Sequence, residues 1–299
     1  MPALDLNAKR AGEHVDAAVR RVTRVLSQAG IETPGLDARR LVEAATGLSA
    51  AELLSAPEAA LDPAASAKLA EMLRRRCARE PVSRILGERE FYGRTFKVTP
   101  ATLDPRPDSE TLIEAALAIV DREGWRTRPL RILDVGTGSG CLLVTLLSEL
   151  PQASGLGGDI SAAALAVAAD NARAHGVLSR MQVALHDGLD GIDGPFDLLV
   201  CNPPYIASAE IAELSPEVRA HDPRHALDGG PDGMAVYRAV MSDLPRVMSH
   251  GWVLFEVGAG QADALSRLIC DTLPGVRTSL QTWKDLGGHV RCVAAEIQL

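Results

Sequence analysis

The stretch Asn202-Pro203-Pro204-Tyr205 offers the most specific chemistry in the chain. The Asn202 side-chain oxygen and the Pro203 carbonyl are acceptors, and neither proline brings a competing backbone donor. Two fixed acceptors can take both hydrogens of a planar NH₂ group, while the Tyr205 ring stacks on the π-face of that group. The same residues would also form a proline-stiffened turn after a buried strand, so alone they favour a function only modestly.

A glycine-rich loop upstream predicts a ligand site. It follows the pattern Asp134-Val135-Gly136-Thr137-Gly138-Ser139-Gly140, and its glycines allow a tight turn and a close approach by a ligand. Asp159 follows at about 20 residues, the spacing at which an acidic side chain binds ribose hydroxyls. The loop lacks both the G-x-G-x-x-G spacing of dinucleotide sites and the Lys-Ser/Thr of a phosphate loop. Since Asp134 would repel a pyrophosphate and attract a cation, the pattern favours S-adenosylmethionine, which carries a sulfonium and an ammonium.

Buried strands must carry both motifs to one edge of a sheet. The run Leu198-Leu199-Val200-Cys201 is apolar throughout, and Asn202 precedes a proline, which favours an extended conformation where the strand ends. Ligands of parallel α/β sheets bind at this carboxyl edge. Strand-like and helical runs alternate from residue 130 onward, which predicts an α/β fold with a parallel sheet. Strands are predicted over 130–135, 181–185, 196–201, 252–257, 276–282 and 289–297, and helices over 140–150, 161–175, 234–248 and 261–273.

Some local features fit this pattern less directly. Residues 153–158 contain three glycines and have little β-propensity, so topology alone predicts a strand before Asp159. Pro245 should kink the helix over 234–248 or end it early. His221 and His225 lie in a Pro- and Gly-rich loop without a third ligand, so no metal site is predicted. Cys201 lies in an apolar strand without an obvious histidine partner, which indicates a core residue rather than a nucleophile.

The first 85 residues predict a small helical module. One helix carries apolar residues at helical spacing from Val15 to Leu26, a second is expected to be capped by Asp37, and others begin at the Ser49/Glu52 capping box and at Asp62-Pro63. The basic cluster Arg74, Arg75, Arg76, Arg79 and Arg84 is interpreted as a solvated helix face, with a docking surface for an acidic partner as the alternative. Because this module contains no evident catalytic residue, we expect it to dock a partner.

Composition narrows the class of partner and the compartment. The net charge is −8; residues 1–85 contain 13 Lys+Arg and 11 Asp+Glu, and residues 86–299 contain 18 and 28. This acidic balance disfavours an enzyme that binds nucleic acid through a broad basic surface. The five scattered cysteines predict reduced thiols and a cytoplasmic protein. Without a signal core or an apolar run near the ~20 residues that span a bilayer, no membrane association is expected.

These motifs resemble those of class I S-adenosylmethionine-dependent methyltransferases that methylate planar nitrogens. More closely, the chain resembles the release-factor glutamine methyltransferases, the PrmC/HemK family. It shares with them F-Y-G at 91–93, P-R-P-D-S-E at 105–110, A-L-D-G-G-P-D-G at 226–233 and E-V-G at 256–258 with Gln261. The match runs from about Glu80 nearly to the C-terminus, and the helical module matches in placement and character. Asp222-Pro223 departs from the family's common Glu-Pro.

The resemblance implies a fold and a set of site residues. The fold is a class I methyltransferase (Rossmann-like), mostly parallel seven-stranded sheet, with a helical substrate-docking domain over 1–85, a β-hairpin linker over 86–104 and a methyltransferase domain over 105–299. For the cofactor, Asp134 and the loop residues Gly136, Thr137, Gly138, Ser139 and Gly140 would hold the methionine part, Asp159 the ribose, and Asp187 with Gly188 the adenine edge, beside Asn202. Asn202 and Pro203 would hold the target amide, with Pro204 and Tyr205 packed on it.

The resemblance also implies the reaction: methyl transfer from S-adenosylmethionine to the side-chain amide nitrogen of a glutamine in peptide-chain release factors, in their Gly-Gly-Gln loop, with no metal. A paralogous family that methylates a ribosomal-protein glutamine usually has Arg-Ser-Pro where this chain has Arg106-Pro107-Asp108, which favours release factors. A methyltransferase for that ribosomal protein, a nucleic-acid base N-methyltransferase and a catalytically inactive binding module are the alternatives. The complete set Asp134, Gly136, Asp159, Asn202 and Tyr205 disfavours the inactive module, and the acidic charge disfavours the nucleic-acid enzyme.

Overall fold

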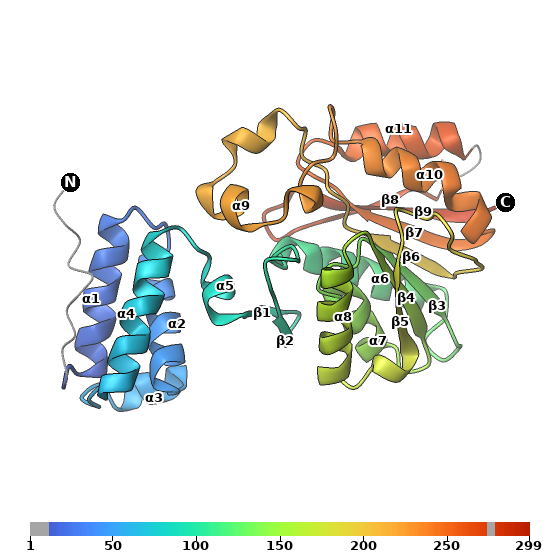
Figure 1. Ribbon diagram of the computed structural model, residues 1–299. Coiled ribbons are helices and arrows are strands. Elements are labelled where there is room, and N and C mark those ends of the chain that lie inside the picture. The colour runs from blue at the N-terminus through green and yellow to red at the C-terminus, as the bar shows by residue number, and fades with distance from the viewer. Residues whose placement is uncertain (1–11, 274–278) are drawn as a thin grey trace. The chain divides into compact units, whose positions relative to one another are not determined.

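The computed structural model describes residues 12–273 and 279–299, which belong to two compact units that divide between Gly87 and Glu88. The first unit is helical (Figure 1). Its helices are α1 (Val15–Gln28), α2 (Pro34–Thr46), α3 (Ala50–Ser55), α4 (Pro63–Cys77) and α5 (Val82–Leu86). Apolar side chains from these helices, among them Leu26, Leu41 and Leu69, are fully buried in one core, which is how short helices become stable.

Two sequence predictions for this unit are confirmed and two are wrong. The Ser49/Glu52 capping box and the Asp62 cap are both present. Asp37 does not cap α2, because the helix begins earlier, with Thr33 at its N-cap and Pro34 in its first turn. Asp37 is instead buried and binds Arg76 Nε over 2.7 Å. Arg76 and Arg84 are both buried, so the arginine cluster is not simply a solvated helix face.

The second unit is built on a seven-stranded sheet in the order β5-β4-β3-β6-β7-β9-β8 (Figure 1). Its strands are β3 (Arg131–Val135), β4 (Ser154–Asp159), β5 (Met181–Leu185), β6 (Leu198–Cys201), β7 (His250–Glu256), β8 (Gln281–Lys284) and β9 (Val290–Gln298). β5, β4, β3, β6 and β7 pair in parallel, and β9 runs antiparallel to β7 and β8. The predicted α/β fold with a mostly parallel seven-stranded sheet is confirmed.

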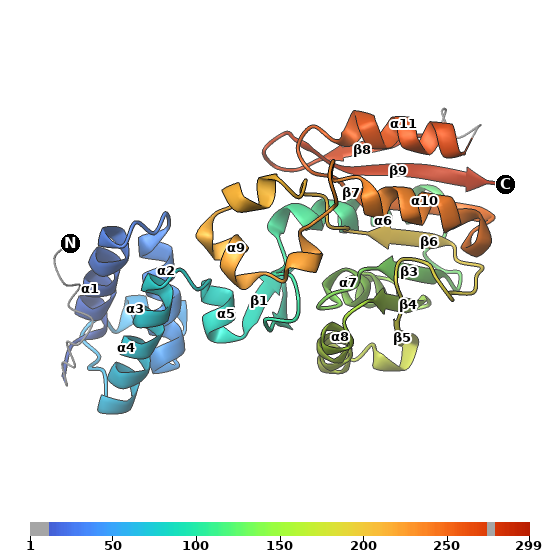
Figure 2. The same ribbon diagram turned by 45° about the horizontal axis from the view of Figure 1, so that its top comes forward.

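Helices cover both faces of this sheet, as Figure 2 shows. On one face lie α6 (Glu110–Arg122), α7 (Cys141–Glu149) and α8 (Ala162–Ala174), and on the other lie α10 (Ala235–Val247) and α11 (Ala262–Thr272). A short helix, α9 (Pro216–His221), and the single turns η1 (Pro107–Ser109), η2 (Leu178–Arg180), η3 (Glu210–Glu213) and η4 (Arg224–Ala226) lie in the connections. Burial on both faces explains why Leu198–Cys201 is apolar at every position.

The β-hairpin before the sheet packs into the same unit. It consists of β1 (Glu88–Phe91) and β2 (Arg94–Lys97), joined by Tyr92 and Gly93, which both have positive φ as a two-residue turn requires. Its Phe91 and Phe96 are buried in the core formed with α6, α7 and α8. The hairpin therefore contributes to the core on that face of the sheet.

The glycine-rich strand β4 forms as topology predicted, and tertiary packing explains its composition. A Cβ at Gly155 would lie 2.5 Å from Leu143 Cδ1, and one at Gly157 would lie 2.9 Å from Thr137 Oγ1. A side chain at either position would force Leu143 or Thr137 to move. Close packing of α7 and the preceding loop on the sheet thus favours glycine here, despite its low β-propensity.

Other boundaries differ modestly from the predictions. The strand predicted over 276–282 is β8, which covers Gln281–Lys284. Residues 276–278 of that prediction lie outside the described residues. α10 does not end before Pro245 but continues to Val247. None of the described helices has the length and apolar character needed to cross a membrane. All five cysteines are free thiols.

Candidate active site

The two predicted motifs leave neighbouring strands at the same level. Val135, the last residue of β3, pairs in register with Cys201, the last residue of β6. The glycine loop therefore starts beside the point where Asn202 leaves the sheet. Since β3 has β4 on one side and β6 on the other, this edge is the topological switch point at which open α/β sheets bind ligands.

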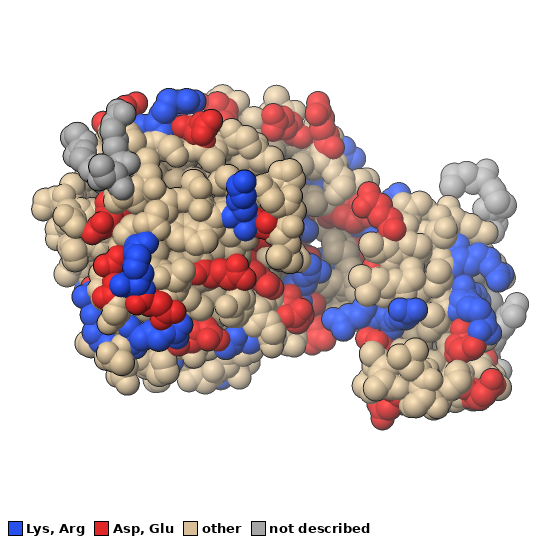
Figure 3. All heavy atoms as spheres, turned by 180° about the vertical axis from the view of Figure 1, so that it is seen from behind, with Lys and Arg blue, Asp and Glu red and all other residues tan. Residues whose placement is uncertain are grey.

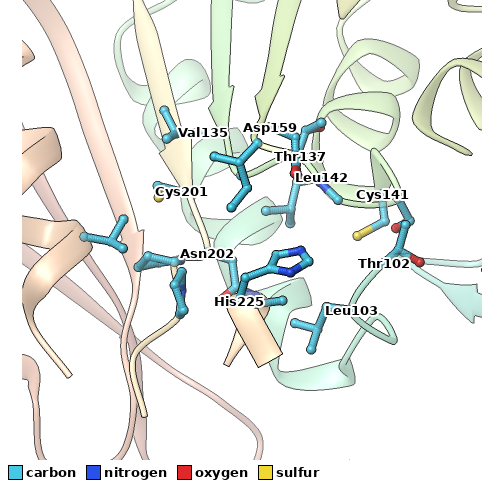
Figure 4. Close-up of a pocket in the computed structure, with 18 of the residues that line it drawn as sticks. Thr102, Leu103, Val135, Thr137, Cys141, Leu142, Asp159, Cys201, Asn202 and His225 are labelled. Carbon is cyan, nitrogen blue, oxygen red and sulfur yellow. Dashed lines mark hydrogen bonds between the residues drawn. The ribbon is translucent and has the colours of Figure 1, made fainter. Parts of the chain in front are cut away.

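A cavity of about 290 Å³ opens at this edge. In Figure 4, Val135 and Cys201 lie on one side of it and Thr102 and Leu103 on the other, with Asn202 and His225 between. Ten of the predicted site residues line it: Gly136, Thr137, Gly138, Ser139, Asp159, Asp187, Gly188, Asn202, Pro203 and Pro204. Asp134, Gly140 and Tyr205 do not.

The glycine loop is held by β4 and by one carboxylate. The N–H groups of Gly136 and Thr137 both donate to the Gly158 carbonyl over 2.9 Å. The Gly138 N–H donates to Asp159 Oδ2 over 2.8 Å, and Gly136 and Gly138 adopt φ of +73° and +56°. Nothing lies within 4 Å of the position that a Cβ would take at Gly136, so this glycine leaves open space at the cavity.

The predicted residues Asp134 and Gly140 lie behind the loop rather than at the cavity. Asp134 is fully buried, and its Oδ2 accepts a hydrogen bond from Thr137 Oγ1 over 2.7 Å. Burial raises the pKa of Asp134 to about 7. Gly140 packs on α8, where a Cβ would lie 3.1 Å from that of Ala168.

A second cavity of about 310 Å³ adjoins the first. The two share the lining residues Leu103, Arg106, Asn202, Pro203 and Ala226. Tyr205, Glu256 and Arg291 line only the second. Asn202 and Pro203 therefore stand at the junction of a glycine-lined space and a space bounded by an aromatic ring and charged groups.

Hydrogen bonds fix the tetrapeptide at both ends. Asn202 Nδ2 donates to Ser109 Oγ over 3.1 Å, and Tyr205 Oη donates to Glu256 Oε1 over 3.4 Å. The Tyr205 carbonyl accepts from Gln261 Nε2 over 2.8 Å. Among the described residues, no donor reaches Asn202 Oδ1 or the Pro203 carbonyl. Both acceptors are left for a ligand.

The glycines at 229 and 233 explain why a glycine-rich motif follows the tetrapeptide. A Cβ at Gly229 would lie 2.6 Å from the Pro204 carbonyl oxygen, and one at Gly233 would lie 2.3 Å from that of Tyr205. The two segments also bridge through Ile206 and Asp228. Only glycine permits this close approach of one backbone to the other.

Comparisons with known proteins show which family this chain resembles. The model of the PrmC N-terminal domain matches residues 17–87, and that of the methyltransferase small domain matches residues 119–230. A release factor glutamine methyltransferase of Cereibacter sphaeroides is 44% identical over 96% of this chain and 99% of its own. Those of Rhodospirillum rubrum and Bradyrhizobium diazoefficiens are 45% and 43% identical, over 90% and 95% of this chain and 81% and 95% of theirs.

The chain belongs to the release factor glutamine methyltransferase family.

The family's common Glu-Pro is Asp222-Pro223 here, and the structure gives Asp222 a defined contact. Asp222 is buried, its Oδ2 accepts from Arg106 Nη2 over 2.5 Å, and its Oδ1 accepts from the Asp104 N–H over 3.3 Å. Arg106 lines both cavities. The shorter acid thus still ties the segment before η1 to the segment after α9.

Sequence reasoning assigned no role to several residues of this family member's site. Thr102, Leu103, Leu142, Ile160 and His186 line the first cavity, and Glu256 and Arg291 line the second. Ser109 and Glu256 lie in motifs that carried the family resemblance, which was the available signal. Burial raises the pKa of Glu256 to about 7, opposed by the Ser109 hydroxyl and by the charge of Arg291.

The minor alternatives at this edge can be placed as well. His225 lines the first cavity, but no cluster of His, Cys, Asp and Glu within the described ranges has the arrangement of a metal site. Cys201 is fully buried, which raises the pKa of its thiol well above the usual value. A thiol held protonated in this way is a poor nucleophile.

Proposed function

We propose that this protein transfers a methyl group from S-adenosylmethionine to the side-chain amide nitrogen of a glutamine in peptide-chain release factors. One observation carries the proposal: two acceptors without protein donors, Asn202 Oδ1 and the Pro203 carbonyl, lie where the two cavities meet. An amide NH₂ has two hydrogens for these two acceptors. The curated relatives are named for this activity on release factors.

The residues around the first cavity fit S-adenosylmethionine. Glycines with positive φ and open space beside them, Gly136 and Gly188, allow a ligand to approach the backbone. Asp159 would bind the ribose and Asp187 would border the adenine. When bound, the cofactor supplies an electrophilic methyl group on its sulfonium.

The tetrapeptide would then prepare the acceptor amide. An amide nitrogen is a poor nucleophile because its lone pair is delocalised into the carbonyl. Asn202 Oδ1 and the Pro203 carbonyl would orient that nitrogen and oppose the positive charge that develops on it during attack. Tyr205, lining the second cavity, would pack on the amide plane and exclude water.

We further propose that the helical unit docks the release factor and that the protein acts in the cytoplasm, where translation ends. A nucleic-acid substrate fits less well. In Figure 3, acidic and basic side chains are interspersed over the face in view. Residues 86–299 carry ten more acidic than basic side chains, 28 against 18.

A comparison of substrates tests the proposal. The full-length protein is incubated with methyl-labelled S-adenosylmethionine and, in parallel, with a purified release factor, ribosomal proteins or duplex DNA. Label in the release factor alone supports the proposal. Label in a ribosomal protein or in DNA would favour one of the alternatives, and no label in any of them would indicate an inactive binding module.

A further inference from the structure

The side-chain amide of Asn202 has a defined orientation, because its nitrogen has a partner and its oxygen has none. Nδ2 donates to Ser109 Oγ over 3.1 Å, and Oδ1 has no donor among the described residues. A carboxamide turned by 180° has almost the same shape, so hydrogen bonding decides which atom faces the cavity. The bond to Ser109 holds the Asn202 amide with Nδ2 away from the acceptor position.

Ser109 does not cap α6. It has helical φ and ψ, because it is the last residue of the turn η1 that leads into α6, and its side chain accepts no backbone N–H of the first turn. Its side chain is directed to Asn202 instead, although Ser109 as a whole is only 3% exposed. Helix capping therefore does not account for this hydroxyl.

A buried carboxyl on the next strand holds the other end of the tetrapeptide. Glu256, the last residue of β7, is 2% exposed and accepts from Tyr205 Oη over 3.4 Å. The other oxygen of this carboxyl, Glu256 Oε2, has no hydrogen-bond partner among the described residues. Ser109 and Glu256 therefore hold the two ends of the tetrapeptide separately, Ser109 at Asn202 and Glu256 at Tyr205.

We infer that Ser109 and Glu256 are positioning residues for methyl transfer, with Ser109 holding the Asn202 amide so that Oδ1 faces the acceptor amide, and Glu256 holding Tyr205 in place. This inference rests on the proposed function, which assigns the junction at Asn202 to the acceptor. Without Ser109, the Asn202 amide is free to rotate and present Nδ2 to the acceptor NH₂. Two donors would then face each other, and the nucleophilic nitrogen would lose one acceptor.

A double-mutant cycle tests this in the full-length protein. Ser109→Ala, Asn202→Ala and the double variant are compared in single-turnover methylation of a release factor, with S-adenosylmethionine affinity and melting temperature measured in parallel. Ser109→Ala should lower the rate roughly tenfold, the size expected for one hydrogen bond, and leave cofactor affinity unchanged. In the Asn202→Ala background the same change should cost less than about twofold, because Ser109 acts through Asn202.

If the wild-type protein methylates the release factor, any of three results would overturn the inference. These are an unchanged methylation rate in Ser109→Ala, an equal loss of rate on adding Ser109→Ala to the wild-type and Asn202→Ala proteins, and a loss of rate that parallels a loss of cofactor affinity. If Ser109→Ala fails to fold, Ser109→Cys takes its place in the cycle, since a thiol is a weak acceptor of similar size and the same coupling is expected. A wild-type protein that leaves the release factor unmethylated would overturn the proposed function, and this inference with it.

Discussion

Asp159 Oδ2 accepts a hydrogen bond from the backbone N–H of Gly138 over 2.8 Å. Its other oxygen accepts from the Ser161 N–H over 2.9 Å. A carboxylate can accept about four hydrogen bonds, so both oxygens retain capacity for hydroxyl groups. One side chain thus fixes the glycine loop and remains able to bind a ribose at the cavity that it lines.

Asp159→Ala should weaken S-adenosylmethionine binding by at least about a hundredfold while the fold persists. Two hydrogen bonds to a charged acceptor are worth roughly 1.5–3 kcal/mol each, and the loop also loses its anchor. Asp159→Asn keeps the shape and one acceptor, so its cofactor affinity should lie between those of the wild-type protein and Asp159→Ala. Calorimetry with the exposed Asp193→Ala as a control measures this. Near-normal affinity in a folded Asp159→Ala variant would remove Asp159 from the cofactor site.

Asn202→Ala should lower kcat by about 10²–10³, by analogy with the loss of one preorganised polar group. The acceptor at Asn202 opposes a charge that exists only in the transition state, so the effect belongs in kcat rather than in cofactor affinity. Asn202→Asp keeps an acceptor and should retain more activity than the alanine variant. Single-turnover methylation rates of the wild-type protein and the two variants test this. A wild-type rate in Asn202→Ala would exclude Asn202 from the mechanism.

A chain beginning at Glu88 should methylate intact release factor with a raised KM, because it lacks the unit to which we assign docking. Cofactor affinity and the rate with a short glutamine peptide should match those of the full chain. The peptide is the matched control, since it is too small to contact a separate docking surface. Equal KM values of both chains for intact release factor would show that the helical unit does not dock it.

The stability of the second unit should depend on pH through Glu256. Burial raises the pKa of this carboxyl from 4.5 to about 7, so its stabilising contribution is complete below pH 4.5 and is lost as the pH rises through 7. The loss is on the order of 3 kcal/mol. Glu256→Gln does not titrate at this position. Raising the pH from 5 to 8 should therefore lower the unfolding free energy of the wild-type protein relative to that of the variant.

Fluorescence can follow this unit selectively, because all three tryptophans, Trp125, Trp252 and Trp283, belong to it. Urea unfolding of the wild-type protein and of Glu256→Gln at several pH values gives the difference between their unfolding free energies. The titration of Asp134, whose pKa is also about 7, is present in both and cancels. A difference that stays constant with pH would mean that the Glu256 carboxyl has an ordinary pKa.

The position of Asn202 could be predicted from the sequence because its causes are local. A continuous apolar run predicts a doubly covered strand, and two prolines end its ladder. The role of Glu256 has no local cause. It lies 51 residues from Tyr205 along the chain and reaches it only because β6 and β7 pair. No sequence pattern specifies that contact.

The same distinction applies to glycine. The loop at 136–140 was predictable because positive φ and close ligand approach are local requirements. Gly155 and Gly157 lowered the strand signal of β4, and their cause is the approach of Leu143 and Thr137 from other elements. Asp134 was expected to face a cationic ligand, whereas its Oδ2 accepts a hydrogen bond from Thr137 Oγ1 behind the loop.

The central claim is that the amide held at Asn202 and Pro203 is the methyl acceptor and belongs to a release-factor glutamine. Tandem mass spectrometry of a release factor, after incubation with S-adenosylmethionine and either wild-type protein or Asn202→Ala, tests this most directly. The account predicts one methyl group on the side-chain nitrogen of the Gly-Gly-Gln glutamine, strongly reduced with the variant. A methyl group on any other atom, or equal methylation by both proteins, would contradict it.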